Sequence, residues 1–189
     1  MNNKNATPKR VIYTSPSFPC RCEVLGDELC NDLVVIRCVD ESSGAEARMS
    51  MSVYDAKFLS EDILGGGLES MASLKFENRY VDYGIDDFVD VYCDCGGGSE
   101  FDDHGVEQIV SRQMSLSATC AGVWKIEVIN GKGIADDNGN VYLYGAPESC
   151  VSATMSRKGF LCLGHALSLA LSLWGYIKLG KVVDTQESA

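Results

Sequence analysis

Two Cys-x-Cys pairs are the residues of this sequence whose type and spacing come closest to metal chemistry. Cys20 and Cys22 form one pair, and Cys93 and Cys95 form the other. Residues i and i+2 of a β-strand share a face, so each pair could present two thiolates to one Zn²⁺ ion, and the four together could form a structural site. The spacing departs from the usual zinc pattern, Cys-x2–4-Cys. Buried, reduced thiols are therefore the favoured interpretation, with zinc binding or a redox role as alternatives.

Cysteine usage also bears on the compartment. The chain contains nine cysteines, and its first ten residues are polar and basic, with no apolar signal segment after them. An odd number of cysteines without a secretory signal argues against a closed disulfide framework. We therefore expect a cytoplasmic protein in a reducing compartment, without a bound cofactor.

Acid–base and nucleophilic chemistry has few candidates in this sequence. Only two histidines occur, His104 and His165, and Cys162 lies three residues before the second. A histidine in an apolar helix is more often a packed residue than a catalytic base, and no zinc-protease, nucleophile-elbow or phosphate-loop motif is found. A protein without enzymatic activity is favoured. A small cysteine-dependent or zinc-binding enzyme that uses the Cys-x-Cys pairs is the alternative.

Negative charge is concentrated in one segment. The 189 residues have a formal net charge of −11, and residues 76–103 contain nine acidic residues against one arginine, which gives −8 for this segment. In a regular strand Asp86, Asp90 and Asp94 share one face, with Phe88 and Tyr92 between them. The opposite face then consists of apolar residues and both cysteines of the second pair.

The acidic segment has three interpretations. It could be a solubilising surface, a docking face for a basic protein, or a divalent-cation site built on Asp82-x-Gly84-x-Asp86. Our leading hypothesis is an acidic protein-interaction module, an inhibitor or assembly subunit, that docks on the basic surface of a partner, including a nucleic-acid-binding partner. The residues of this face are Asp82, Asp86, Asp87, Asp90, Asp94, Asp102 and Asp103. The strongly acidic balance argues against direct binding of nucleic acid, which requires clustered lysines and arginines.

These residues must be positioned by an α+β fold. Alternating and β-branched runs predict mainly antiparallel hairpins and meanders, a short helix near residues 54–63 ended by Gly65–Gly67, and a buried apolar C-terminal helix near residues 160–179. We expect a flexible loop at Gly96–Gly98 and turns at Asn130-Gly131 and at residues 137–139. The predicted strands cover residues 11–13, 22–25, 32–39, 48–53, 79–83, 87–93, 122–129 and 141–144.

The same order of elements occurs twice along the chain. We expect a flexible basic arm at residues 1–10, one α+β domain at 11–182 and a tail at 183–189. Within the domain, residues 11–75 and 104–182 could form two meander-plus-helix halves around the acidic segment 76–103. This doubling resembles single-stranded nucleic-acid-binding folds made of four-stranded meanders plus a helix, although a basic patch is missing.

The apolar stretch at residues 160–177 has two further interpretations. It contains 18 residues without a formal charge, the minimum for a membrane span, so a membrane-associated subunit anchored by this segment is an alternative. Its glycines, serines and histidine, together with a β-rich domain that needs a covering helix, favour a core or interface helix instead. A leucine face left uncovered would drive homo-oligomerisation.

Overall fold

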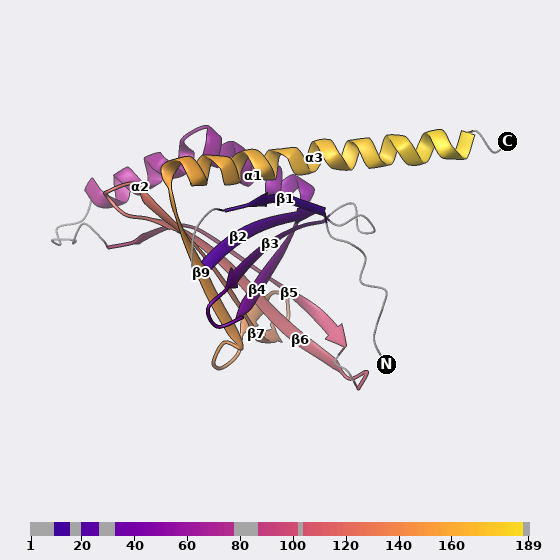
Figure 1. Cartoon of the computed structure of the whole chain (residues 1–189). Coiled ribbons are helices and arrows are strands. Elements are labelled where there is room, and N and C mark those ends of the chain that lie inside the picture. The colour runs from indigo at the N-terminus through magenta and orange to yellow at the C-terminus, as the bar shows by residue number, and fades with distance from the viewer. Residues whose placement is uncertain (1–9, 16–19, 27–32, 78–86, 102–103, 187–189) are drawn as a thin grey trace.

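The computed structural model describes residues 10–15, 20–26, 33–77, 87–101 and 104–186 of the chain. This part forms nine antiparallel strands in two sheets and three helices, which confirms the α+β class (Figure 1). The strand expected at residues 79–83 and most of the basic arm lie outside the described residues.

The first sheet is a four-stranded meander. Its strands are β1 (Arg10–Thr14), β2 (Cys20–Gly26), β3 (Leu33–Asp40) and β4 (Glu46–Ser52), in that spatial order. The register places Val24 opposite Ile36, and Ile36 opposite Met49. These three side chains share the inner face and are buried, because alternate residues of a strand point to the same side.

The second sheet repeats the antiparallel order with longer strands. It consists of β5 (Val89–Phe101), β6 (Glu107–Ala118), β7 (Val123–Ala135) and β9 (Ser149–Ser156), while the short β8 (Val141–Leu143) pairs with the far end of β7. Leu116, Ile126 and Ala153 lie opposite one another and are buried. Strand β9 packs against β2, β3 and β4, so both sheets contribute to one hydrophobic core.

Three helices cover one side of the sheets: α1 (Val53–Leu64), α2 (Gly67–Glu77) and α3 (Arg157–Gln186) (Figure 1). Ser52 caps α1 by accepting a hydrogen bond from the Asp55 N–H, and Gly65 ends it, as the glycine run predicts. Helices α1 and α3 approach closely at Gly164, whose carbonyl accepts a hydrogen bond of 2.7 Å from the buried Ser60 hydroxyl. A Cβ on Gly164 would lie 2.7 Å from a side-chain carbon of Ile63, so this contact requires glycine.

Helix α3 is longer than expected, and its first turns contribute to the core. Phe160, Leu163 and Leu167 are fully buried, whereas Leu169 is 54% exposed. The remainder of the helix projects past the end of the first sheet (Figure 1). No helix in the described part of the chain is both long and apolar enough to span a membrane.

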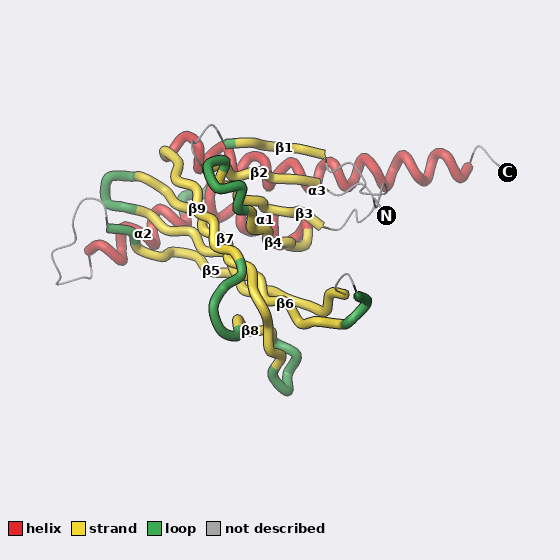
Figure 2. The backbone as a smooth tube through the Cα atoms, turned by 60° about the horizontal axis from the view of Figure 1, so that its bottom comes forward, coloured by secondary structure: helices red, strands yellow, loops and turns green. Residues whose placement is uncertain are grey.

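Two turn predictions in the second sheet are wrong for a common reason. Gly96–Gly98 lies within β5 and Asn130-Gly131 lies within β7, with unbroken pairing through both segments. A Cβ on Gly97 would lie 2.6 Å from Val141 of β8, and a Cβ on Gly131 would lie 2.6 Å from Leu143 of β8, so glycine here makes room for a strand that packs across the sheet. The ends of β5–β7, together with β8, extend away from the helices (Figure 2).

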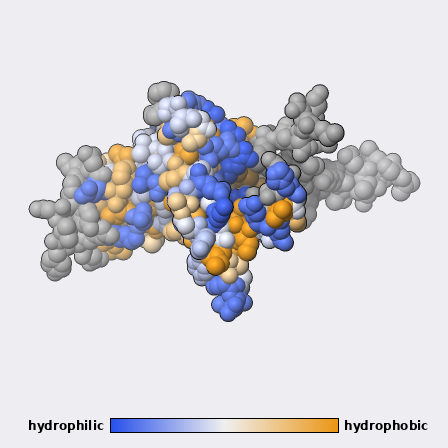
Figure 3. Space-filling view, turned by 90° about the horizontal axis from the view of Figure 1, so that it is seen from below, coloured by the Kyte–Doolittle hydropathy of each residue, from blue (hydrophilic) through white to orange (hydrophobic). Residues whose placement is uncertain are grey.

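The acidic segment is not separate from the second sheet. Its described part, β5, is the edge strand that pairs with β6. The division into halves at residues 75 and 104 stays a prediction, but each sheet is followed along the chain by a helix, α1 after β4 and α3 after β9. In the view from below, hydrophilic and apolar residues are intermixed on the described surface (Figure 3).

Candidate functional site

A β-bulge in β5 decides which way the acidic side chains point. Asp90 pairs with Ser117 and Tyr92 with Leu116, so Val91 is an extra residue on this strand. A bulge shifts the alternation of faces by one residue. Asp90 is therefore exposed on the outer face of the sheet, whereas Asp94 and Tyr92 are half-buried on the other face. The prediction that Asp90 and Asp94 share a face is wrong.

The same bulge brings the second cysteine pair to the surface. Before the bulge Val89 and Val91 are buried, as predicted for the apolar face. After it Cys93 and Cys95 are exposed, which corrects the expectation of two thiols on the apolar side. Phe88 lies on the outer face, where the Lys125 ammonium sits 5.0 Å from its ring centroid.

Acidic side chains from α1 and β5 converge around Tyr92. Burial raises the pKa of Tyr92 to about 12, and the charges of Asp94, Asp55 and Asp62 add to that increase. Burial and the charge of Asp55 likewise raise the pKa of Asp94, against the opposing effect of a hydrogen bond from the Cys95 N–H. Like charges therefore lie close together in a partly buried environment, and both effects disfavour ionisation of Tyr92 and Asp94. We call Asp55, Asp62 and Asp94 the α1–β5 acidic surface.

Cations in the described part of the chain form no ion pair with the α1–β5 acidic surface. Among the ion pairs between described residues, none involves these three aspartates. Lys75 of α2 contacts β5 through the backbone carbonyl of Asp90. The outer face of the first sheet is different, since Glu23 lies 2.9 Å from the Arg21 guanidinium and 3.2 Å from that of Arg37.

The remaining predicted docking residues are only partly visible. Asp87 is exposed next to the start of β5. Asp82, Asp86, Asp102 and Asp103 lie outside the described residues, and their part in a docking face stays a prediction. Asp55 and Asp62 were missed, because the proximity of Asp55 to Asp94 and of Asp62 to Tyr92 arises from the tertiary fold and no local pattern indicates it.

The two Cys-x-Cys pairs belong to different sheets. Cys20 is half-buried and Cys22 buried in β2, whereas Cys93 and Cys95 are exposed in β5. Within the described ranges no three histidine, cysteine, aspartate or glutamate side chains come close enough together to hold a metal. Cys22 instead contacts Cys38, and this contact together with burial raises the pKa of the Cys38 thiol. These two cysteines act as small apolar residues of the core.

The histidines form no catalytic arrangement with these thiols. His165 and Cys162 are both exposed on α3, so the expectation of a packed histidine is wrong. His104 is exposed in the turn that precedes β6.

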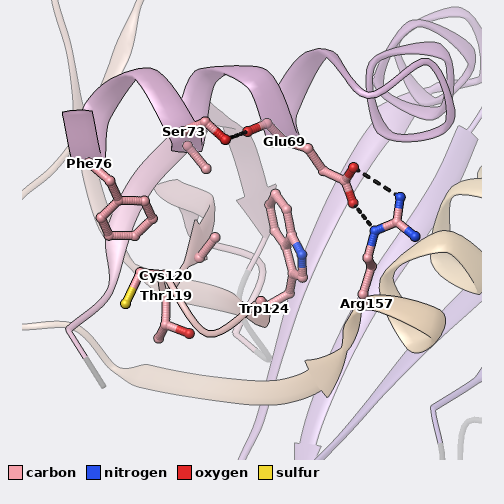
Figure 4. A pocket seen from close by; sticks show the side chains of 10 residues that line it. Glu69, Ser73, Phe76, Thr119, Cys120, Trp124 and Arg157 are labelled. Carbon is pink, nitrogen blue, oxygen red and sulfur yellow. Dashed lines mark hydrogen bonds and ion pairs between the residues drawn. The ribbon is translucent and has the colours of Figure 1, made fainter. Parts of the chain in front are cut away.

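A small cavity of about 220 Å³ opens between α2 and the β6–β7 turn (Figure 4). Trp124 lines its middle, and Phe76 and Cys120 lie at one end. At the other end the Arg157 guanidinium binds Glu69 through two contacts of 2.5 and 3.1 Å. Because Glu69 neutralises this arginine, the cavity lacks the net positive charge that an anion site needs.

Neither the models of known protein families nor the curated proteins show a significant match to this sequence.

Proposed function

We propose that this protein is a non-enzymatic interaction module, an inhibitor or assembly subunit, that docks the α1–β5 acidic surface on a basic surface of a partner protein. The observation that carries the proposal is Asp94, a partly desolvated carboxylate that faces Asp55 without a cation from the described residues. Such a cluster lowers the stability of the free protein and is relieved by lysines or arginines of a partner. The predicted aspartates 82, 86, 87, 102 and 103 would extend the same surface.

A basic peptide of known sequence tests this proposal directly. We expect a lysine-rich peptide to shift the backbone resonances of α1 and β5 in ¹⁵N-labelled protein, with an affinity that falls as the salt concentration rises. Binding should also lower the pKa of Asp94, since a cation favours its charged form. Shifts spread evenly over all acidic residues would instead indicate attraction by net charge.

Charge-matched variants separate the surface from the net charge. Asp55→Asn with Asp94→Asn removes two charges from the surface, and Asp137→Asn with Glu148→Gln removes two exposed charges near β8. We expect the first variant to weaken binding about tenfold, or roughly 0.7 kcal/mol for each charge, and the second about twofold. Equal losses in both variants would refute docking through this surface.

Self-association is a second candidate, favoured by the length of α3. The helix continues for sixteen residues after Ala170, and this part projects from the body of the molecule (Figure 1). We propose that two copies associate through this projection, whose sequence contains apolar residues such as Leu173, Trp174 and Ile177. Light scattering should give a mass that increases with concentration in the full chain and stays monomeric in a chain shortened to residue 171.

A further inference from the structure

The edge of β5 after its bulge is open to pairing with another strand. Strand β5 lies at the end of the second sheet, and β6 is its partner among the described strands. Every second residue of such an edge directs its N–H and carbonyl groups away from the sheet. At the start of β5 the Lys75 ammonium of α2 contacts the Asp90 carbonyl. From Cys93 to Phe101 no strand of the described ranges pairs with this edge.

The sequence of this edge lacks residues that commonly prevent strand pairing. Proteins often protect an exposed edge with lysine, with proline or with a covering element. Residues 93–101 contain no lysine, arginine or proline, and the glycines 96–98 place no bulky side chain beside the backbone. The bulge at Val91 lies before this stretch, and pairing with β6 from Tyr92 to Phe101 is regular. Residues 93–101 are therefore a regular template for an added strand.

A groove of about 460 Å³ lies beside the same stretch. It is lined by Cys95–Gly97 of β5 and by residues 139–142 of β8 and the turn before it. The Asp136 carboxylate accepts hydrogen bonds of 2.9 Å from the Asn140 side chain and 3.2 Å from the Tyr142 hydroxyl, and both of these residues line the groove. The hydrogen bonds from Asn140 lower the pKa of Asp136, so this side of the groove is negatively charged at neutral pH.

The charges on the two sides of the β5 edge select the kind of strand that can add there. Alternate side chains of an added strand point to opposite faces of the sheet. On one face they would lie near Asp94, which is half-buried beside Asp55, and on the other they would lie over the groove near Asp136. Lysine and arginine suit both faces. A second copy of β5 would instead bring its own aspartates toward Asp94, and like charges across a strand pair are destabilising.

We propose that a segment of the partner protein that contains lysine or arginine adds to β5 as an extended strand along residues 93–101. Hydrogen bonds between the two backbones supply affinity, and basic side chains at alternating positions supply specificity. This inference rests on the proposed function, because it states the form in which the basic partner binds. The docking segment is an extended strand, and the groove beside Cys95–Gly97 receives its outward side chains.

A short peptide of alternating lysine and threonine, and the same peptide with methylated backbone nitrogens, test this inference on the full chain. Both peptides have the same charge, but methylation removes the N–H donors that pair with an edge strand. We expect the unmethylated peptide to bind about tenfold more tightly. It should slow amide exchange in residues 93–99 and give nuclear Overhauser effects between its α-protons and those of β5.

The outcomes separate strand addition from docking by charge. Equal affinities of the two peptides without protection of β5 would overturn strand addition and leave the proposed docking intact. Protection at the edge of β1 in place of β5 would also overturn it. If neither peptide bound, the proposed function and this inference would both be refuted.

Two tyrosine variants supply the matched controls for the groove. Tyr142→Ala removes a residue that lines the groove and should weaken binding of the unmethylated peptide about fivefold. Tyr144→Ala, at a side chain that is 66% exposed and outside the lining of the groove, should leave binding unchanged. Circular dichroism checks that each variant is folded. Equal losses in the two variants would mean that the peptide does not occupy the groove, and would overturn this placement of the strand.

Discussion

The side chain of Asn130 in β7 pairs with the backbone of Arg48 in β4 across the boundary between the two sheets. Its Oδ1 accepts a hydrogen bond of 2.7 Å from the Arg48 N–H, and its Nδ2 donates one of 2.7 Å to the Arg48 carbonyl. The amide thereby satisfies both backbone groups of an edge-strand residue, much as a neighbouring strand would. One residue of the second sheet thus holds the edge of the first.

Asn130→Ala should destabilise the protein by about 1–3 kcal/mol, because it leaves two partly buried backbone groups of Arg48 without partners. Urea unfolding measures the change. Asn138→Ala, in the exposed turn before β8, should change stability by less than about 0.5 kcal/mol. Similar effects at the two positions would show that the Asn130 amide does not stabilise the contact between the sheets.

Gly97→Ala should displace β8, because the new Cβ would lie 2.4 Å from the Val110 carbonyl oxygen and 2.6 Å from a methyl carbon of Val141. Overpacking of this kind costs about 1–3 kcal/mol, and it should speed amide exchange in β8. Gly98→Ala is the matched control, since its Cβ would meet nothing within 4 Å. Equal exchange rates in the two variants would contradict the close packing of β8.

Phe160→Leu should lower stability by about 1–3 kcal/mol, because Phe160 stacks on Trp124 with ring centroids 3.7 Å apart and both rings buried. The near-ultraviolet circular dichroism of Trp124 should weaken in a Trp174→Phe background. Phe58→Leu, at a side chain 63% exposed, should cost less than about 0.5 kcal/mol. Equal losses would mean that the stacked pair does not anchor α3 to the sheet.

Local patterns predicted the elements well where neighbouring segments did not interfere. The β-branched run of β3 and the capped helix α1 were expected within one or two residues of their bounds. Errors arose at Gly96–Gly98 and Asn130-Gly131, where turn residues serve tertiary contacts instead, and the predicted strands include no counterpart of β6. Gly97 makes room for Val141, and Asn130 binds Arg48, two relationships that no window of sequence contains.

The candidate site was less predictable, because one extra residue in β5 changes which side of the sheet the following side chains point to. The segment's charge was evident from composition, and the alternation was correct as far as Val91. The bulge then exchanged the faces of Asp94 and Cys93, and α1 supplied Asp55 from a distant part of the sequence. Bulges depend on pairing with the neighbouring strand, so the aspartates could be predicted as a group but not in their orientation.

Asp94 should make the stability of the protein rise as the pH falls from 7 toward 4. Its pKa is raised in the folded state above the usual value near 3.8, so the native protein holds this proton more tightly than the unfolded chain. The destabilisation caused by ionised Asp94 is fully present at a pH above its pKa in the folded state. It disappears at a pH below its pKa in the unfolded chain. Asp94→Asn removes it, so the variant should be at least as stable as wild type at pH 7 in urea unfolding at low ionic strength.

Asp40 provides the control of opposite sign. Hydrogen bonds from the Ser42 and Ser43 hydroxyls and from the Ser42 N–H lower the pKa of Asp40 to about 2. The contribution of Asp40 to the free energy of unfolding is constant from pH 7 to about pH 4. It is lost as the pH falls from about 4 toward 2. The difference in unfolding free energy between wild type and Asp94→Asn should therefore shrink as the pH falls from 7 to about 4. Over the same range the difference between wild type and Asp40→Asn should stay constant. If the difference in unfolding free energy between wild type and Asp94→Asn did not depend on pH, Asp94 would have the same pKa in the folded and unfolded states. The proximity of Asp55 to Asp94 would then have no energetic effect.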